Sequence, residues 1–305
     1  MSIIEPLAFL NGRFVGQSEL TLKFYDAGFV FGATVTDFCR TYRRQLFRWA
    51  DHQARLRSDC AAIGIPLVHN NSELTTAAEK LIQQNGTLVA AGTELLLITF
   101  ATPGPVGSLI GIPSDSTPTL GMHTVPMSFQ RYRRFFTEGV TLAVAGLHPS
   151  DGIVPNHVKH RSRLHWWLAQ NATTDPTALP VLLDQNGVAD TAIGSLLVVR
   201  ENRVIRPTKG SVLESVSLSV VRDLCDKIGV AFVEERVAFH EMITDPTITE
   251  VLLTGSGFGL AGVRRITTTH SEHDIPWPGP ILRRLQQAWS ELVGLDIEQQ
   301  ILGGR

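Results

Sequence analysis

The sequence predicts a mixed α/β (or α+β) fold in two domains, on three observations. Patterns typical of strands and of helices alternate in both halves of the chain. The 305 residues, 43% hydrophobic and 18% charged, suffice for a large buried core. A basic, aromatic stretch without strand pattern separates the halves near Gln130. We therefore expect a smaller N-terminal α/β domain over 1–130 and a larger C-terminal domain over 131–305.

Composition narrows the function classes. The formal net charge of −2 gives no electrostatic reason to expect a nucleic acid or an anionic membrane as partner. Cys39, Cys60 and Cys225 are widely spaced, which favours buried reduced thiols and indicates no metal site. The first residues lack the pattern of a signal peptide, and no apolar run reaches membrane-spanning length. We expect a cytoplasmic protein.

The N-terminal half begins with sheet. An apolar run from Leu7, a turn at Asn11-Gly12 and a strand over 13–15 predict a hairpin, with a further strand through Leu20 and Leu22. Alternation and apolar runs predict three more strands, over 35–42, 94–101 and 119–125. Helical spacing predicts two helices, from about 51 to 64 and from about 72 to 84. The Gly- and Pro-rich loop over 102–118 is long enough to suggest that it reaches an active site or a partner subunit.

The C-terminal half continues the alternation. Expected strands cover 139–147, 178–183, 196–199, 231–237, 250–254 and 260–266, with a turn over 184–187. A helix over 216–228 has one apolar stripe and Gly229 at its end. A helical turn near Met242 and a last helix over 280–292 complete the pattern.

The segment over 151–170, DGIVPNHVKHRSRLHWWLAQ, places Lys159 between an apolar run and a predicted helix. Ser162 is the expected cap of that helix, whose Leu164, Trp167 and Leu168 share one face. Two interpretations are open. The segment is a basic surface turn, or Lys159 is an amine nucleophile that forms a Schiff base with a carbonyl cofactor such as pyridoxal phosphate.

Eight short motifs in one order favour the second interpretation. They are DAGFVFG, RTY, HQARL, the lysine, LLDQNG, RENRVIRP, SVLESVS and EVLLTGSG. In this order the chain resembles the class IV (fold-type IV) pyridoxal-phosphate enzymes from about Asn11 to Val263. That family includes branched-chain and D-amino-acid transaminases and aminodeoxychorismate lyase. The resemblance implies a two-domain fold-type IV enzyme and a homodimer with pyridoxal 5'-phosphate between the domains.

The resemblance assigns roles to several residues. It implies that Lys159 binds the cofactor covalently and moves the α-proton, and that Arg55 of HQARL binds the cofactor phosphate. Val216 and Ser217 begin a helix, where free N–H groups favour an anion. Ser256 matches the family's hydroxyl residue between two glycines. Where branched-chain transaminases usually have a tyrosine, this chain has Leu164.

The acid beside the pyridine nitrogen is open between two registers. A match without gaps from Asp184 places Thr191 there, whereas counting back from Pro207 places Asp190 there with one deletion. We prefer Asp190, because a carboxylate keeps the ring nitrogen protonated and the cofactor a strong electron sink.

Substrate-binding residues are implied more weakly. By analogy, the backbone amides of Ser256 and Gly257 hold the substrate carboxylate, and Phe31 stands at the pocket wall. Arg40 and Tyr42 fall on one face of a predicted strand, which allows both to line the site, and either one is equally compatible with a surface position. We expect the three tryptophans of the late helices, Trp166, Trp167 and Trp289, to pack in the interior.

Three functions are compatible with these observations. The first is an amino-acid transaminase of the branched-chain type, acting on an amino acid and a keto acid. The second is an elimination of the aminodeoxychorismate-lyase type, which the context KHRSRL favours. The third is a module that binds nucleic acid or another anion through Lys159, Arg161, Arg163 and the tryptophan pair, which the near-neutral charge opposes. We expect the transaminase.

Overall fold

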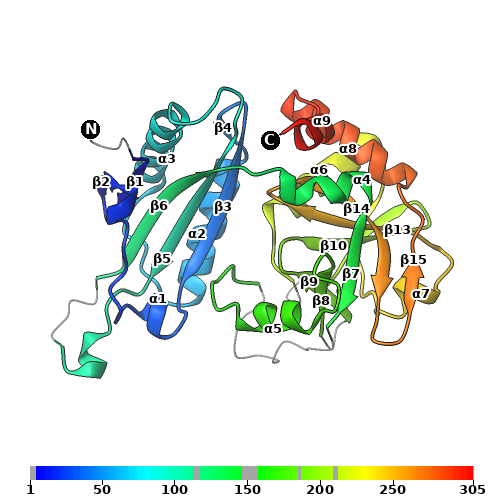
Figure 1. The fold of residues 1–305 in the computed structure, drawn as a ribbon, viewed down its shortest axis with the longest axis horizontal. Helices are drawn as coiled ribbons and strands as arrows, with labels where there is room; N and C mark the ends of the chain where they lie inside the picture. The colour runs from blue at the N-terminus through cyan, green and yellow to red at the C-terminus, as the bar shows by residue number, and fades with distance from the viewer. Residues whose placement is uncertain (1–4, 113–116, 146–156, 185–186, 209–211, 305) are drawn as a thin grey trace. The chain divides into compact units, whose positions relative to one another are not determined.

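The computed structural model describes residues 5–112, 117–145, 157–184, 187–208 and 212–304. The chain forms two compact units (Figure 1). The N-terminal unit comprises Met1–Met127 and Val158–Ser162, and the C-terminal unit comprises Ser128–His157 and Arg163–Arg305. The predicted mixed α/β fold is therefore present, but the lysine segment belongs to the N-terminal unit.

A six-stranded antiparallel sheet forms the N-terminal unit, in the order β2-β1-β6-β5-β3-β4. The strands are β1 (Leu7–Leu10), β2 (Arg13–Gly16), β3 (Val35–Tyr42), β4 (Gln45–Leu46), β5 (Leu95–Thr102) and β6 (Thr119–Pro126). The helical segments are η1 (Gln17–Glu19), α1 (Ala27–Val30), α2 (Trp49–Ala62), α3 (Asn71–Gly86) and η2 (Gly107–Ile110). A capping box between Asn70 and Glu73 starts α3.

Strand alternation separates the two faces of this sheet. Val35 and Cys39 of β3 join the buried core against α2 and α3, together with Leu95 and Leu97 of β5. Residues of the other parity point to the opposite face. There Phe38 of β3 pairs with Ile98 of β5, and Ile98 pairs with His123 of β6. These three residues form a row across the sheet.

The C-terminal unit contains a nine-stranded sheet in the order β12-β11-β10-β13-β14-β7-β8-β9, with β15 paired to β14. Its strands are β7 (Val140–Val144), β8 (Leu179–Asp184), β9 (Gly187–Thr191), β10 (Ser195–Arg200), β11 (Arg203–Arg206), β12 (Phe232–Glu234), β13 (Ile248–Gly255), β14 (Gly259–Thr267) and β15 (Glu272–Asp274). Because β9 also pairs with β10, the path from β9 through β8, β7, β14 and β13 to β10 closes on itself.

Helices surround the closed part of this sheet. They are η3 (Gln130–Tyr132), α4 (Arg133–Thr137), α5 (Leu164–Ala172), α6 (Val216–Ile228), α7 (Glu241–Thr244), α8 (Pro280–Val293) and α9 (Ile297–Gly303). Ser215 caps α6 by accepting a hydrogen bond from the Leu218 N–H, and Gly229 ends it at a φ of 69°. The predicted bounds of α6 are thus those of the structure.

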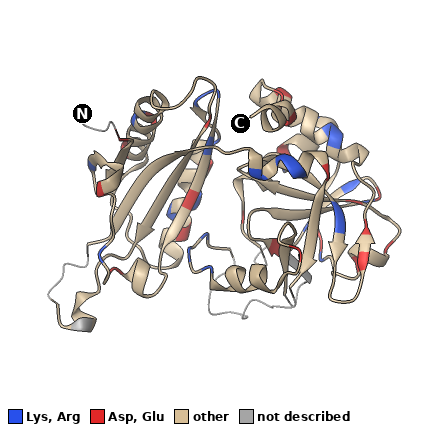
Figure 2. Cartoon of the chain, in the orientation of Figure 1, with Lys and Arg blue, Asp and Glu red and all other residues tan. Residues whose placement is uncertain are grey.

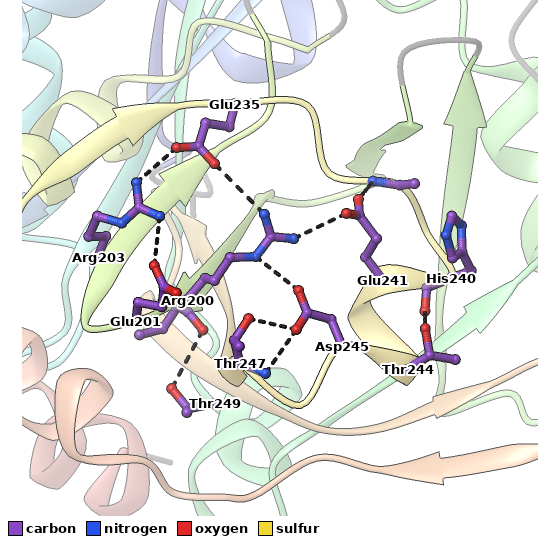
Figure 3. Close-up of polar contacts among 12 residues, drawn as sticks. Arg200, Glu201, Arg203, Glu235, His240, Glu241, Thr244, Asp245, Thr247 and Thr249 are labelled. Carbon is purple, nitrogen blue, oxygen red and sulfur yellow. Dashed lines mark hydrogen bonds and ion pairs between the residues drawn. The ribbon is translucent and has the colours of Figure 1, made fainter.

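An arginine network ties the edge of the sheet to α7 (Figure 3). Arg200, at the end of β10, lies 3.2 Å from Asp245 through Nε and 3.4 Å from Glu241 through Nη2. Its Nη1 is 3.8 Å from Glu235, which also pairs with Arg203 at 3.0 Å. We interpret this half-buried cluster as structural, since its charges face one another.

Several predicted elements differ from the structure. The expected strand through Leu20 and Leu22 is wrong, because η1 follows β2 and no strand follows it before β3 in the described chain. The sequence did not predict β9, β11, β15 or α9, whose short lengths give weak patterns. The strand over 139–147 and the turn over 184–187 lie partly outside the described residues.

Charged residues of both signs occur in both units (Figure 2). This distribution agrees with the formal net charge of −2. Within the described ranges, no helix has both the length and the apolar character needed to cross a membrane. The three cysteines are buried and free, as predicted.

Candidate active site

Lys159 lies in an extended segment along the edge of β3. The Lys159 carbonyl accepts a hydrogen bond from Thr36 N–H at 2.9 Å, and Arg161 N–H donates to the Thr34 carbonyl at 2.9 Å. The Lys159 N–H donates to the Asp59 carboxylate of α2 at 3.0 Å. Sheet and helix therefore fix the lysine backbone from two sides.

The prediction that Ser162 caps the helix after Lys159 is wrong. Ser162 does not cap α5, because its hydroxyl donates to the Gly32 carbonyl at 2.8 Å and α5 begins at Leu164 after Arg163. The apolar face of α5 is not buried in the single chain, where Leu164 and Trp167 are 69% and 66% exposed. The prediction that Trp167 packs in the interior is therefore wrong, whereas Trp289 is buried.

The Lys159 side chain is half-buried over an aromatic ring. Its Nζ lies 5.1 Å from the centroid of the Phe38 ring. At this distance the ring face attracts a cation and shields one side of the amine from water. The lysine is therefore not a freely solvated surface residue.

Arg55 is held by a buried carboxylate that the sequence analysis missed. Nε and Nη2 of Arg55 donate to Asp37 Oδ2 at 2.9 and 2.7 Å, and His52 Nδ1 lies 2.6 Å from Asp37 Oδ1. Burial opposes the charge of Asp37, but Arg55 and His52 hold the pKa of this carboxyl well below its ordinary value. The two bonds leave Nη1 of Arg55 outside the ion pair.

Arg55 and Lys159 are connected through α2. Asp59, which accepts the hydrogen bond from the Lys159 N–H, follows Arg55 by four residues and so lies on the same side of the helix. Asp37 on β3 fixes the arginine, and Asp59 on α2 fixes the lysine segment. Both carboxylates are buried. The signal in the sequence that could have identified Asp37 is its position between the apolar residues Val35 and Cys39 of a predicted strand.

The predicted substrate residues of the N-terminal unit differ in their burial. Arg40 and Tyr42 are 2% and 5% exposed and lie on one face of β3, with the guanidinium 3.8 Å from the ring centroid. Arg40 Nε also donates to the Thr41 carbonyl at 3.2 Å. Phe31, at the end of α1, is 60% exposed in the single chain. The surface alternative for Arg40 and Tyr42 is therefore wrong.

Asp190 and Thr191 are adjacent on β9 and make different contacts. Asp190 Oδ2 accepts a hydrogen bond from the Leu213 N–H at 3.0 Å. The Thr191 hydroxyl donates to the Gly194 carbonyl at 2.8 Å and accepts from the Gly194 N–H at 3.0 Å. Thr191 therefore closes the turn between β9 and β10, and strand alternation directs the Asp190 carboxylate to the opposite face.

Hydroxyl groups gather at the start of α6. The Ser217 and Ser256 hydroxyls lie 3.5 Å apart, and the Ser195 hydroxyl donates to that of Ser215 at 3.3 Å. Val216 and Ser217 occupy the first turn, where backbone N–H groups have no partner within the helix. Hydroxyl and N–H donors at a helix N-terminus favour a bound anion.

Glycines allow the turn that carries Ser256 to pack closely. A Cβ at Gly255 would lie 2.7 Å from the Ile193 carbonyl oxygen, and one at Gly257 would clash with the Tyr132 hydroxyl. Larger residues would displace this turn from the start of α6. The structure thus groups Asp190, Ser217 and Ser256 in the C-terminal unit, and Arg55 and Lys159 in the N-terminal unit.

Comparisons with known proteins identify the family of the chain. The sequence model of the amino-transferase class IV family matches residues 34–266. The D-alanine aminotransferase of Bacillus licheniformis is 24% identical over 283 residues, which cover 91% of this chain and 94% of that protein. This match spans nearly the full length of both chains.

Two solved structures share the fold. The branched-chain amino acid aminotransferase of Escherichia coli superimposes with a TM-score of 0.82 at 19% identity, covering 95% of each chain. The 4-amino-4-deoxychorismate lyase of Pseudomonas aeruginosa gives a TM-score of 0.75 at 22% identity, covering 95% of this chain and all of that one (100%). At these identities the likeness shows a common fold, shared by transaminases and a lyase.

Proposed function

The chain belongs to the class IV aminotransferase family, and from this premise we propose that it is an amino-acid transaminase that uses pyridoxal 5'-phosphate. The observation that carries the proposal is the position of Lys159. Its backbone is bound to both β3 and α2, and its amine lies over Phe38. A lysine fixed in this way is suited to act as a nucleophile and a base.

The donor set of the described residues fits the functional groups of this cofactor. A phosphate needs several N–H or O–H donors, and we assign to it the first turn of α6 with Ser217 and Ser256 in the C-terminal unit, and Arg55 in the N-terminal unit. A protonated pyridine nitrogen needs an anionic acceptor, and we assign Asp190 to it. Thr191 is less suited, because its hydroxyl is engaged with Gly194.

The residues of the chain would divide the chemistry as follows. Pyridoxal phosphate, when bound, supplies a ring that stabilises negative charge on the α-carbon of the amino acid. Lys159 Nζ would take the proton from that carbon and release it at a different carbon from the one it left, as the transfer of the amino group requires. Phe38 excludes water from one side of the amine, and Asp37 keeps Arg55 oriented. We assign the amides of Ser256 and Gly257 to the substrate carboxylate.

The proposal is tested by absorbance and by amino-group transfer. The purified protein with added pyridoxal phosphate should show a visible absorption band, and borohydride reduction should attach the cofactor to Lys159. Lys159→Ala should lose both. Lys227→Ala, which removes an exposed lysine paired with Glu291, is the control and should keep them. A wild-type protein that takes up no pyridoxal phosphate would contradict the proposal.

A lyase is the second candidate. The segment KHRSRL favours it, because Leu164 replaces the tyrosine usual in branched-chain transaminases. Formation of pyruvate from aminodeoxychorismate, without conversion of the bound cofactor by any amino acid, would decide for the lyase. Conversion by an amino acid, followed by recovery with a keto acid, would decide for the transaminase.

We further propose a homodimer in which exposed apolar side chains of the N-terminal unit become buried. These side chains are Phe24, Phe29, Phe31 and Leu109, each at least 60% exposed in the single chain. The Gly104 carbonyl accepts a hydrogen bond from the Ala27 N–H, so the long loop is attached to α1, the helix that carries Phe29. Each phenylalanine buried on association would contribute about 1.5–3 kcal/mol.

Sedimentation tests the dimer directly. The wild-type protein should sediment as a dimer, and Phe29→Ser with Leu109→Ser should shift it toward the monomer. Leu292→Ser, which removes an exposed leucine of α8, serves as the control and should leave the dimer intact. A wild-type monomer that binds the cofactor fully would refute this assignment.

A further inference from the structure

The face of the N-terminal sheet opposite α2 and α3 places a second basic residue beside Lys159. The segment over 158–162 pairs antiparallel with the start of β3, through a bridge between Val35 and His160. Val158 is buried in the core with Val35. Alternation therefore directs Lys159 and Arg161 together to the opposite face, with Cα atoms about 6.6 Å apart.

The two cations share one aromatic ring. The Arg161 guanidinium lies 5.7 Å from the centroid of the Phe38 ring, and Lys159 Nζ lies 5.1 Å from the same centroid. Phe38 heads the row that continues through Ile98 to His123. The lysine amine, the guanidinium and the imidazole thus belong to one surface of the sheet.

This surface holds positive charge without a carboxylate partner for the arginine. In the described ranges, Arg161 contacts the Phe38 ring and, through its backbone N–H, the Thr34 carbonyl; it forms no ion pair. Nδ1 of His123 is buried and has no hydrogen-bond partner among these residues. Burial and the nearby Arg161 lower the pKa of His123, so the imidazole is neutral at neutral pH. An unpaired guanidinium beside a nucleophilic amine is suited to bind an anionic group of the substrate.

We propose that Arg161 is a specificity-determining residue that binds a carboxylate on the side chain of the substrate. The proposal rests on the proposed function, in which Lys159 acts at the α-carbon. An α-carboxylate is bonded to that carbon itself, whereas Arg161 is offset along the strand by two residues. A carboxylate at the far end of a substrate side chain can span this distance. Dicarboxylic amino acids and keto acids are therefore the favoured class of substrates.

Steady-state kinetics of the protein loaded with pyridoxal phosphate test the assignment. Arg161→Gln should lower kcat/KM for aspartate or glutamate by about 10- to 100-fold, the usual effect of losing one charge-assisted hydrogen bond. For alanine and leucine it should change kcat/KM by less than about threefold. Arg161→Lys keeps the charge and should recover part of the loss. Arg222→Gln, which removes an exposed arginine of α6, is the matched control.

Equal losses for both classes of amino acid would assign Arg161 to the α-carboxylate or to the fold, and would overturn the proposal. An unchanged preference in Arg161→Gln would also overturn it. The kinetic test requires transaminase activity, so a second measurement separates the failure of the proposed function from the failure of this inference.

The second measurement is the calorimetric binding of glutarate, with valerate as the monocarboxylate of equal length. Neither compound carries an amino or keto group, so no reaction is needed. The wild-type protein should bind glutarate more tightly than valerate, and Arg161→Gln should remove the difference. Glutarate binding that is absent, or equal in both proteins, would refute the role of Arg161 even in an active transaminase. Selective binding in a protein without transaminase activity would contradict only the proposed reaction.

Discussion

Replacement of Asp37 by asparagine should destabilise the N-terminal unit strongly. The Asp37 carboxylate is 2% exposed and binds Arg55 through two hydrogen bonds and His52 through one. Asp37→Asn removes the charge and leaves the buried Arg55 guanidinium without its counter-ion. Breaking one partner of a buried ion pair typically costs about 3–5 kcal/mol. Asp51→Asn on α2, the helix that carries Arg55, removes an exposed pair with Arg48 and should cost less than about 1 kcal/mol.

Two measurements at pH 7 test this prediction: urea denaturation gives the free energy of unfolding, and hydrogen exchange of peptides from α2 gives the local stability of that helix. The protection of the α2 amides from exchange should fall in Asp37→Asn and stay near the wild-type value in Asp51→Asn. Affinity for pyridoxal phosphate should fall with it, since Asp37 orients Arg55. A loss of stability in Asp37→Asn that is no larger than the loss in Asp51→Asn would refute this prediction.

The pH dependence provides an independent check. Arg55 and His52 hold the pKa of Asp37 below its ordinary value of 3.8 in spite of burial. A carboxyl with a lowered folded-state pKa stabilises the protein fully above its unfolded-state pKa, and this contribution is lost as the pH falls through the folded-state pKa. The stability difference between wild type and Asp37→Asn should therefore be constant from neutral pH to about pH 4 and shrink below it. A difference that grows on acidification would contradict the assigned ion pair.

Three further predictions concern other parts of the chain. Glu250→Gln should cost about 1.5–3 kcal/mol in urea denaturation, because this buried carboxylate accepts two backbone N–H bonds at the start of α8, each of 2.8 Å; a neutral result would exclude that role. Asp190→Asn should keep the cofactor bound but slow single-turnover proton transfer, whereas Thr191→Val should lower stability by about 1 kcal/mol and keep turnover; the reverse order would favour the other register. The folded protein should not react with a thiol reagent at pH 8, since burial raises the pKa of both Cys60 and Cys225 to about 12; rapid labelling before denaturant is added would contradict this.

Local patterns in the sequence determined much of the fold. The apolar stripe and Gly229 gave the bounds of α6, and strict alternation gave those of β3, because both patterns are set by neighbours a few residues apart. The collinear motifs also indicated the family, which the match over residues 34–266 bears out. Short elements such as β9 and α9 were missed, because so few residues carry little periodic signal.

Contacts between residues distant in the sequence were decided only by the tertiary structure. The Lys159 N–H meets Asp59, and Asp37 meets Arg55, through strand pairing and helix packing that no local pattern encodes. The Ser162 hydroxyl donates to the Gly32 carbonyl rather than capping α5, because the segment over 158–162 pairs with the start of β3, which follows Gly32 in the chain. The sequence predicted that Lys159 is a nucleophile. The pairing of its segment with β3 decided which neighbours it has, because the pairing register selects the face toward which Lys159 and Arg161 point.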